Sequence, residues 1–271
     1  MDNLQFNNGL TVPALGFCTY GIPASETVSA VQQALELGYR GIDTAQFNGN
    51  EAPTGAAVRQ SAIPRAEVFV TSKVQTNGYA ATKAGIDDSL KRSGLDYFDL
   101  LLLHWPMPDT LGSYRALEEA YQAGKTRSIG LSNFNISQTK NVMDSFATKP
   151  VVDEIETHLY LQQEKMHAFL EKNDIVHEAY GPFGEDVRAM ISIPTVQNIA
   201  QKHHKTPAQI ILKFLVQSKI MVNARSISPQ HMQANLNIFD FELTADDMQA
   251  LRALERHQPM IDWPTTMHID E

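Results

Sequence analysis

Eight short apolar runs, separated by segments with helical spacing, restrict the fold of this chain more than any other feature. Several of them, such as Leu100 to Leu103, are continuously apolar, as in strands that are buried on both faces of a parallel sheet. Eight such strands, each followed by a helix, predict an α/β fold of the (β/α)8 TIM-barrel class. The runs lie at residues 14–17, 39–43, 68–73, 98–104, 127–132, 151–157, 175–180 and 220–225.

The main alternative to a closed barrel is an open, doubly wound sheet. No glycine-rich GxGxxG follows the first run, which weakens the dinucleotide-binding form of that alternative. At the N-terminus, Asn8-Gly9 separates two short β-prone pieces between Leu4 and Val12, a pattern typical of a β-hairpin. Barrels of this class often reach the 271 residues found here as one unit, so we expect residues 1–271 to form a single domain.

Helix boundaries are marked by local signals along the chain. Gly38 follows a run of helical spacing and predicts a helix end. Thr206-Pro207 predicts a helix start, and Thr244 with Asp247 forms a capping box at the start of another helix.

Charge and cysteine content exclude several classes of protein. The formal net charge of −9 disfavours DNA or RNA partners, although a few local cations suffice for one bound nucleotide. Cys18 is the only cysteine, so no intramolecular disulfide is possible, and this fits a reducing cytosol. The N-terminal residues have neither a basic start nor an apolar run, and no stretch is long enough to span a membrane. We therefore expect a cytoplasmic protein with no nucleic-acid or membrane partner.

Three polar residues close successive apolar runs: Asp43, Lys73 and His104. The carboxyl ends of barrel strands meet at one mouth, where the chemistry of such folds is located. The three residues therefore predict a buried lysine–aspartate pair, able to lower the pKa of a third group, beside a histidine that can hydrogen-bond a substrate oxygen.

Several segments resemble the aldo-keto reductase family, in its bacterial short-loop form. The resemblance runs in register from about residue 5 to 255 and implies a barrel that reduces aldehydes and ketones with NADPH or NADH. It also implies a cofactor that lies extended over the barrel mouth, and a monomer. The segments are GIDTAQFNGNE (41–51), VFVTSKV (68–74), LLLHWP (101–106), GLSNFN (130–135) and FDFELTADDM (239–248).

The resemblance assigns a catalytic tetrad with one member changed. In that family a tyrosine, acidified by a lysine that an aspartate holds, protonates the carbonyl oxygen while a histidine orients it. Asp43, Lys73 and His104 match three members, and the tyrosine position is Asn48. An amide has no titratable proton to give, so a general-acid step typically worth about 10²–10⁴ in rate must come from elsewhere. We expect diminished turnover.

The resemblance also implies a nicotinamide site. Ser132 and Asn133 match residues that hold the carboxamide, and Tyr180 matches the aromatic residue that stacks on the ring. The expected glutamine is Glu154. Its carboxylate suits an oxidised, cationic nicotinamide better than a reduced one and is costly if it is buried unpaired.

At the adenosine end, Arg225 and Ser226 match a basic residue and a serine that meet the 2′-phosphate, and Asn235 matches an adenine contact. The arginine that is usual in the family is His231 here, which weakens one phosphate contact and predicts better tolerance of NADH. An equally open interpretation makes His231 a surface residue on the helix that Ser228-Pro229 begins.

Other departures from the family fall near the same mouth: Cys18 for glycine, Gln75 for tryptophan and Asn223-Ala224 for Ile-Pro. Their concentration suggests relaxed function or a natural or engineered remodelling of the pocket. One alternative is therefore an ester hydrolase in which Cys18 attacks with help from His104. Lys73 acting as a Schiff-base amine is a variant of this idea, and a non-catalytic cofactor-binding protein is a further alternative.

Two regions give little information. The short loops do not identify the substrate, and the C-terminal tail offers only Trp263 as a pocket lid. His203-His204 lies in an expected helix-to-helix connection without acids or cysteines at ligand spacing, so we predict no metal site.

Overall fold

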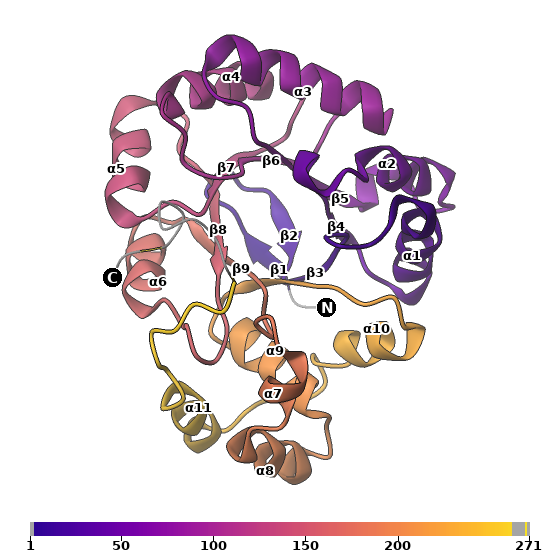
Figure 1. The fold of residues 1–271 in the computed structure, drawn as a ribbon, viewed down its shortest axis with the longest axis vertical. Helices are drawn as coiled ribbons and strands as arrows, with labels where there is room; N and C mark the ends of the chain where they lie inside the picture. Colours follow the sequence, from indigo (N-terminus) through magenta and orange to yellow (C-terminus); the bar gives the residue numbers. More distant parts are fainter. Residues whose placement is uncertain (1–2, 262–268, 270–271) are drawn as a thin grey trace.

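The computed structural model describes residues 3–261 and residue 269. Eight parallel strands close into a barrel in the order β10-β3-β4-β5-β6-β7-β8-β9, which confirms the predicted fold class (Figure 1). Every predicted apolar run overlaps one of these strands. The barrel strands are β3 (Leu15–Cys18), β4 (Gly41–Asp43), β5 (Phe69–Val74), β6 (Leu100–Leu103), β7 (Ile129–Ser132), β8 (Val152–Glu156), β9 (Val176–Tyr180) and β10 (Met221–Ala224).

Helices surround the barrel, and at least one follows each strand (Figure 1). One helix follows each of the first six barrel strands, three follow β9 and two follow β10. The helices are α1 (Ala24–Leu37), α2 (Glu51–Gln60), α3 (Tyr79–Ser93), α4 (Thr110–Gln122), α5 (Ile136–Ser145), α6 (Glu164–Lys172), α7 (Val187–Ile191), α8 (Pro194–His203), α9 (Pro207–Gln217), α10 (Pro229–Leu236) and α11 (Ala245–Arg252).

The N-terminal hairpin consists of β1 (Asn3–Gln5) and β2 (Thr11–Pro13), which pair antiparallel as predicted. Gly9 adopts a φ of 86° at the turn, a conformation that favours glycine. Phe6 and Val12 pack in a cluster with Leu100 and Leu102 near the N-terminal ends of the strands. The hairpin thereby covers one end of the barrel, while the carboxyl ends of the strands form the other.

The strand β6 explains the continuous apolar run in the sequence. Leu100 and Leu102 belong to the cluster beneath the barrel, whereas Leu101 and Leu103 belong to the core that includes the surrounding helices. Since both faces of the strand meet apolar neighbours, all four leucines are buried.

The predicted helix ends are also confirmed. Gly38 caps α1 in the left-handed conformation, and capping boxes begin α9 at Thr206 and α11 at Thr244. His203 ends α8, and its Nε2 lies 2.8 Å from Asp247 Oδ2 at the start of α11. One histidine of the His203-His204 pair therefore fastens two helices together.

Gly55 allows α2 and α3 to approach closely. A Cβ atom at this position would lie 2.0 Å from the carbonyl oxygen of Ser93 and 2.7 Å from its carbonyl carbon. Because these are backbone atoms, the clash cannot be relieved by rotating a side chain. The absence of a side chain at Gly55 therefore sets the spacing of two neighbouring helices.

We predict that Gly55→Ala destabilises the protein by about 1–3 kcal/mol, because it overpacks this contact. Helix propensity alone predicts the opposite effect, an increase of about 1 kcal/mol in the free energy of unfolding. Urea unfolding followed by circular dichroism measures the difference. Ala52→Gly at an exposed position of α2 is the control, with an expected loss of about 0.5–1 kcal/mol from propensity alone. Unchanged or greater stability of Gly55→Ala would contradict the prediction.

Candidate active site

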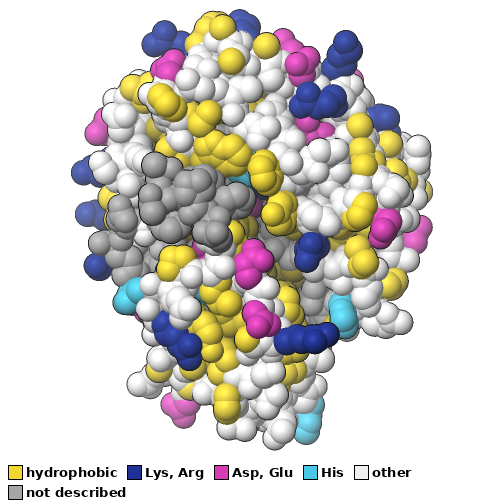
Figure 2. Space-filling model, viewed as in Figure 1, with side chains coloured by type: hydrophobic (Ala, Val, Ile, Leu, Met, Phe, Trp, Pro, Cys, Tyr) yellow, Lys and Arg dark blue, Asp and Glu magenta, His cyan; other side chains and the backbone are white. Residues whose placement is uncertain are grey.

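A cavity of about 290 Å³ lies at the carboxyl ends of the barrel strands. Figure 2 shows a hollow on this face with hydrophobic side chains around it. Most of the predicted site residues line the cavity, including all three tetrad matches and Asn48. The predicted residues on its wall are Cys18, Asp43, Asn48, Lys73, His104, Ser132, Asn133, Glu154, Tyr180, Asn223 and Arg225.

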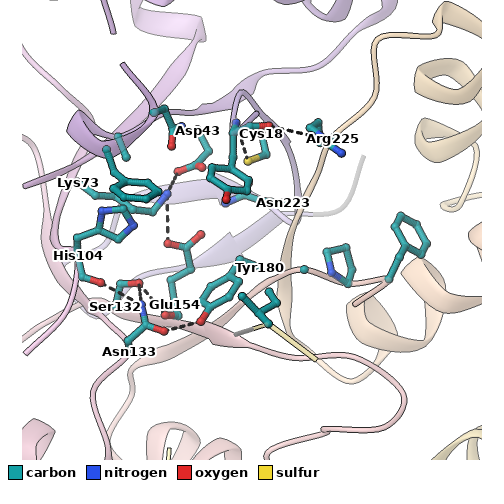
Figure 3. Close-up of a pocket in the computed structure, with 18 of the residues that line it drawn as sticks. Cys18, Asp43, Lys73, His104, Ser132, Asn133, Glu154, Tyr180, Asn223 and Arg225 are labelled. Carbon is teal, nitrogen blue, oxygen red and sulfur yellow. Dashed lines mark hydrogen bonds and ion pairs between the residues drawn. The ribbon is translucent and has the colours of Figure 1, made fainter. Parts of the chain in front are cut away.

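The ammonium group of Lys73 is the centre of the site. Its Nζ lies 2.5 Å from Asp43 Oδ1 and 3.2 Å from Glu154 Oε2, and all three side chains are almost fully buried (Figure 3). Burial by itself lowers the pKa of Lys73, but the Asp43 and Glu154 carboxylates outweigh it and hold the pKa well above the usual range. Lys73 is therefore a fixed cation at the mouth.

His104 follows β6 and is a neutral imidazole at neutral pH. Burial, and after it the positive charge of Lys73, lower the pKa of His104 well below the usual value. Its ring stacks on Trp105 with the centroids 4.3 Å apart, and its buried Nδ1 has no hydrogen-bond partner among the described residues. A neutral imidazole held in this way can donate an N–H hydrogen bond to a substrate oxygen.

The loop after β4 carries Asn48, in a short 3-10 helix (Gln46–Asn48). Asn50 anchors this loop, because its side chain accepts from the hydroxyl groups of Thr19 (3.1 Å) and Thr44 (2.9 Å) and donates to the Thr19 carbonyl (2.8 Å). Asn48 Nδ2 lies 3.3 Å from Thr19 Oγ1. Asn48 lines the cavity, and one of its amide hydrogens is directed to the buried Thr19 hydroxyl.

The predicted nicotinamide residues form one connected group. Tyr180 donates to Asn133 Oδ1 (2.5 Å), and Asn133 Nδ2 donates to the His104 carbonyl oxygen (3.0 Å) and to Ser132 Oγ (3.1 Å), as Figure 3 shows. Ser132 Oγ in turn donates to the backbone oxygen of Glu154 (2.9 Å). An aromatic face, a hydroxyl and an amide thus meet at one wall of the cavity.

The predicted adenosine contacts are only partly on the cavity wall. Arg225 lines the cavity and is exposed, with its Nη1 at 3.4 Å from the Tyr20 carbonyl oxygen. Ser226 lies in the loop after β10 and hydrogen-bonds Ser228, while His231 and Asn235 lie on α10. His231 is exposed and Asn235 is buried. These three side chains lie beyond the described cavity.

Cys18 is paired in register with Asp43 rather than placed beside His104. Burial, and after it the Asp43 carboxylate, raise the pKa of the Cys18 thiol well above its usual value. A thiolate nucleophile is thus disfavoured. The ion pairs of Lys73 likewise keep its amine protonated, which disfavours a Schiff base. Gln75, which stands where the family commonly has a tryptophan, does not line the cavity.

Two features of the site were missed in the sequence. Glu178 on β9 is fully buried inside the barrel, where Asn223 Nδ2 donates to its Oε1 (2.5 Å). The signal in the sequence is an acidic residue in the middle of the predicted strand at residues 175–180. The other feature is an aromatic rim, in which Tyr20 and Phe47 stack with their centroids 6.3 Å apart. No spacing rule pairs these two residues, since they belong to different loops.

No group of three potential metal-ligating side chains occurs within the described ranges. In the same part of the chain, no helix has both the length and the apolar character to cross a bilayer. Trp263 lies outside the described residues, so its predicted role as a lid has no structural counterpart here.

Comparisons with known proteins agree with this geometry. The sequence profile of the "Aldo/keto reductase family" matches residues 14–256. An aldo-keto reductase of Mycobacterium sp. (strain MCS) is 41% identical over 260 residues, which are 94% of this chain and 91% of that protein. The crystal structure of MGS-M4, an aldo-keto reductase from a Medee basin deep-sea metagenome library, has a TM-score of 0.93 at 37% identity, covering 97% of this chain and 100% of its own. An aldo/keto reductase from Brucella melitensis has a TM-score of 0.90 at 38% identity, covering 93% and 97%.

We predict that Glu154→Gln stabilises the protein increasingly as the pH rises. Burial raises the pKa of Glu154 from 4.5 to about 7, so the folded state binds this proton more tightly than the unfolded chain does. That stabilisation is complete below the unfolded pKa and is lost as the pH rises through the folded one. Relative to the wild type, Glu154→Gln should gain about 2 kcal/mol in unfolding free energy between about pH 5 and pH 8.

Urea unfolding at the two pH values measures this difference. Glu185→Gln, which removes an exposed carboxylate at the same rim, is the matched control. Its unfolding free energy relative to the wild type should be nearly the same at both pH values. A pH-independent gap between wild type and Glu154→Gln would show that Glu154 titrates normally.

Proposed function

Because this chain belongs to the aldo/keto reductase family, we propose that it reduces small aldehydes or ketones with NADPH or NADH, at low turnover. The family and the fold support an oxidoreductase. The observation that carries the finer proposal is the convergence of Asp43, Lys73 and His104 on one cavity, with Asn48 on the same wall.

Each of these residues has a distinct part in polarising a carbonyl group. The Lys73 ammonium stabilises the negative charge that develops on the substrate oxygen, and Asp43 keeps it charged and in place. The neutral imidazole of His104 orients the oxygen by a hydrogen bond. The Asn48 amide can donate a further hydrogen bond to the same oxygen.

Proton delivery is the weak step of this site. Asn48 has no acidic proton, and neutral His104 would have to become an imidazolate to donate one. The proton therefore comes from water that enters the cavity, without the acceleration of a positioned acid. This is the physical reason for the low turnover that we propose.

The residues on the cavity wall suit a nicotinamide cofactor, which would supply the hydride when bound. Tyr180 offers an aromatic face, Ser132 and Asn133 offer hydrogen-bonding groups, and the buried carboxylate of Glu154 lies on the same wall. Arg225, an exposed cation at the cavity, can pair with a phosphate group.

The aromatic rim favours substrates with an apolar or aromatic substituent. Tyr20 is 49% exposed and Phe47 is 44% exposed, and both line the cavity. Phe47 also meets the rings of His104 and Trp105 edge to face, at 5.8 and 5.9 Å. A ring or short alkyl group can be buried here while its carbonyl points at Lys73.

The cytoplasmic location and the monomeric state stay predictions. The single cysteine supports the former. The resemblance to the aldo-keto reductase family supports the latter, and sedimentation of the purified chain measures it.

We predict that Asn48→Tyr raises kcat/KM for benzaldehyde reduction by about 10²-fold, because it restores a phenol beside Lys73. Asn48→Phe is the matched control, since it adds the same ring without the hydroxyl group and should give no gain. Steady-state NADPH oxidation measures both variants. Equal rates for the two variants would refute the assignment of position 48.

Cofactor choice gives a second test. We predict that Arg225→Gln weakens NADPH binding by about tenfold or more, since a charge-assisted phosphate contact is lost, and leaves NADH binding nearly unchanged. His231→Arg should strengthen NADPH binding alone. Fluorescence titration of the wild type and the two variants gives the six dissociation constants. A His231→Arg variant that binds NADPH as the wild type does would support His231 as a mere surface residue.

A further inference from the structure

The polar groups inside the barrel carry an excess of acid. Asp43, Glu154 and Glu178 are buried carboxyl groups, and Lys73 is the only cation paired with any of them in the described part of the chain. The ion pair of Lys73 with Asp43 is neutral as a unit. The charge of the site therefore depends on the other two carboxyl groups.

Glu178 is the deeper of the two and does not line the cavity. It is fully buried, its Oε1 accepts from Asn223, and its Oε2 has no hydrogen-bond partner among the described residues. Burial, and after it the charges of Glu154 and Asp43, raise the pKa of Glu178 well above the usual value. A Cβ atom at Gly16 would lie 2.2 Å from Asn223 Oδ1, so the missing side chain of Gly16 makes room for this asparagine. This environment thus favours the protonated, neutral form of Glu178.

Glu154 is the carboxyl group that faces the cavity. It lies on β8 beside Ser132 of β7 in register, and Figure 3 shows its carboxylate between Lys73 and Tyr180. Among residues 3–261, Lys73 is the only cation paired with Glu154, and it is closer to Asp43. When Glu154 ionises, the group of Asp43, Lys73 and Glu154 therefore passes from neutral to a net charge of −1.

We propose that Glu154 makes this site bind the oxidised, cationic form of the nicotinamide cofactor more tightly than the reduced form, and does so in a pH-dependent way. The proposal rests on the proposed function. An ionised carboxylate beside the position of a positively charged ring attracts it, whereas the neutral reduced ring gains nothing from the same charge. A glutamine at this position would not distinguish the two forms by charge.

The pH dependence follows from the same arrangement. Burial raises the pKa of Glu154 to about 7, so its charge appears near neutral pH. By reciprocity, binding of a cation must release the Glu154 proton. The titratable and charged groups around Glu154 are Cys18 of β3, Asp43 of β4, Lys73 of β5, and Glu178 and Tyr180 of β9. Asp153, the neighbouring residue of β8, is hydrogen-bonded to Thr139 of α5 instead.

This preference has a consequence for the direction of the reaction. Oxidation of an alcohol transfers a hydride from its carbon to the oxidised cofactor and releases the hydroxyl proton to solvent, which leaves a carbonyl product. Tighter binding of the oxidised form favours that direction at low cofactor concentration and makes the oxidised form a strong product inhibitor of carbonyl reduction.

The experiment compares NADP⁺ with NADPH on the full-length chain by isothermal titration calorimetry, between about pH 6 and pH 8.5. Both forms carry the same 2′-phosphate, so its titration cancels in the comparison. We expect the ratio of the NADPH to the NADP⁺ dissociation constant to rise about tenfold over this range, as for a close charge pair. Titrations in buffers of different ionisation enthalpy should show about half a proton released on NADP⁺ binding near pH 6.5 and none specific to NADPH, since the pKa is about 7 and a tenfold ratio corresponds to a pKa shift of about one unit.

Two variants locate the effect. Glu154→Gln should make the ratio independent of pH and remove the extra proton release, whereas Glu178→Gln, the matched carboxyl group away from the cavity, should keep both. Retention of the pH-dependent ratio in Glu154→Gln overturns the proposal. Equal binding of both forms at every pH also overturns it and leaves the proposed function standing. Failure of both forms to bind at millimolar concentration rejects the proposed function itself.

Discussion

The interaction on which the rest of the site depends is the buried ion pair between Lys73 and Asp43. A charged amine is costly inside a barrel unless it is matched, and the 2.5 Å contact to Asp43 provides the match on the neighbouring strand. The register of β4 and β5 places both groups at the same mouth. Once this cation is fixed, it adds to the effect of burial in lowering the pKa of His104, and it pairs with Glu154. The Asp43 and Glu154 carboxylates in turn keep the amine protonated.

In the function that we propose, the protein keeps the electrostatic part of a carbonyl-polarising site and changes the proton-delivering part. Asn48 needs no ionisable partner, so the Lys73 ammonium is not required to acidify a neighbour. The loop that carries it is still held by Asn50 in three hydrogen bonds to Thr19 and Thr44. A framework that remains intact around a changed side chain is consistent with a site that still binds ligands while its chemistry is slowed.

Acidic groups inside the barrel form the second departure, and they are linked to one another. Glu154 lies next to Glu178 in register, and Asn223 bonds Glu178 in space that Gly16 leaves open. Because these side chains come from adjacent strands, a change of charge at one is felt by the others at short range in a poorly hydrated interior. The barrel interior therefore acts as one electrostatic unit rather than as separate residues.

The sequence by itself determined the barrel, its hairpin and the mouth at which Asp43, Lys73 and His104 meet, because apolar runs, turn residues and strand-end polar groups are local patterns with few ways to pack. It also located Asn48 by register with a known family. Only the tertiary structure decided which groups touch. Cys18 lies beside Asp43 instead of His104, Gln75 stands off the cavity, and Glu178 enters the same charged group as Glu154. These outcomes depend on strand register and on the direction of each side chain, which arise from closure of the whole barrel and leave no mark at any single position.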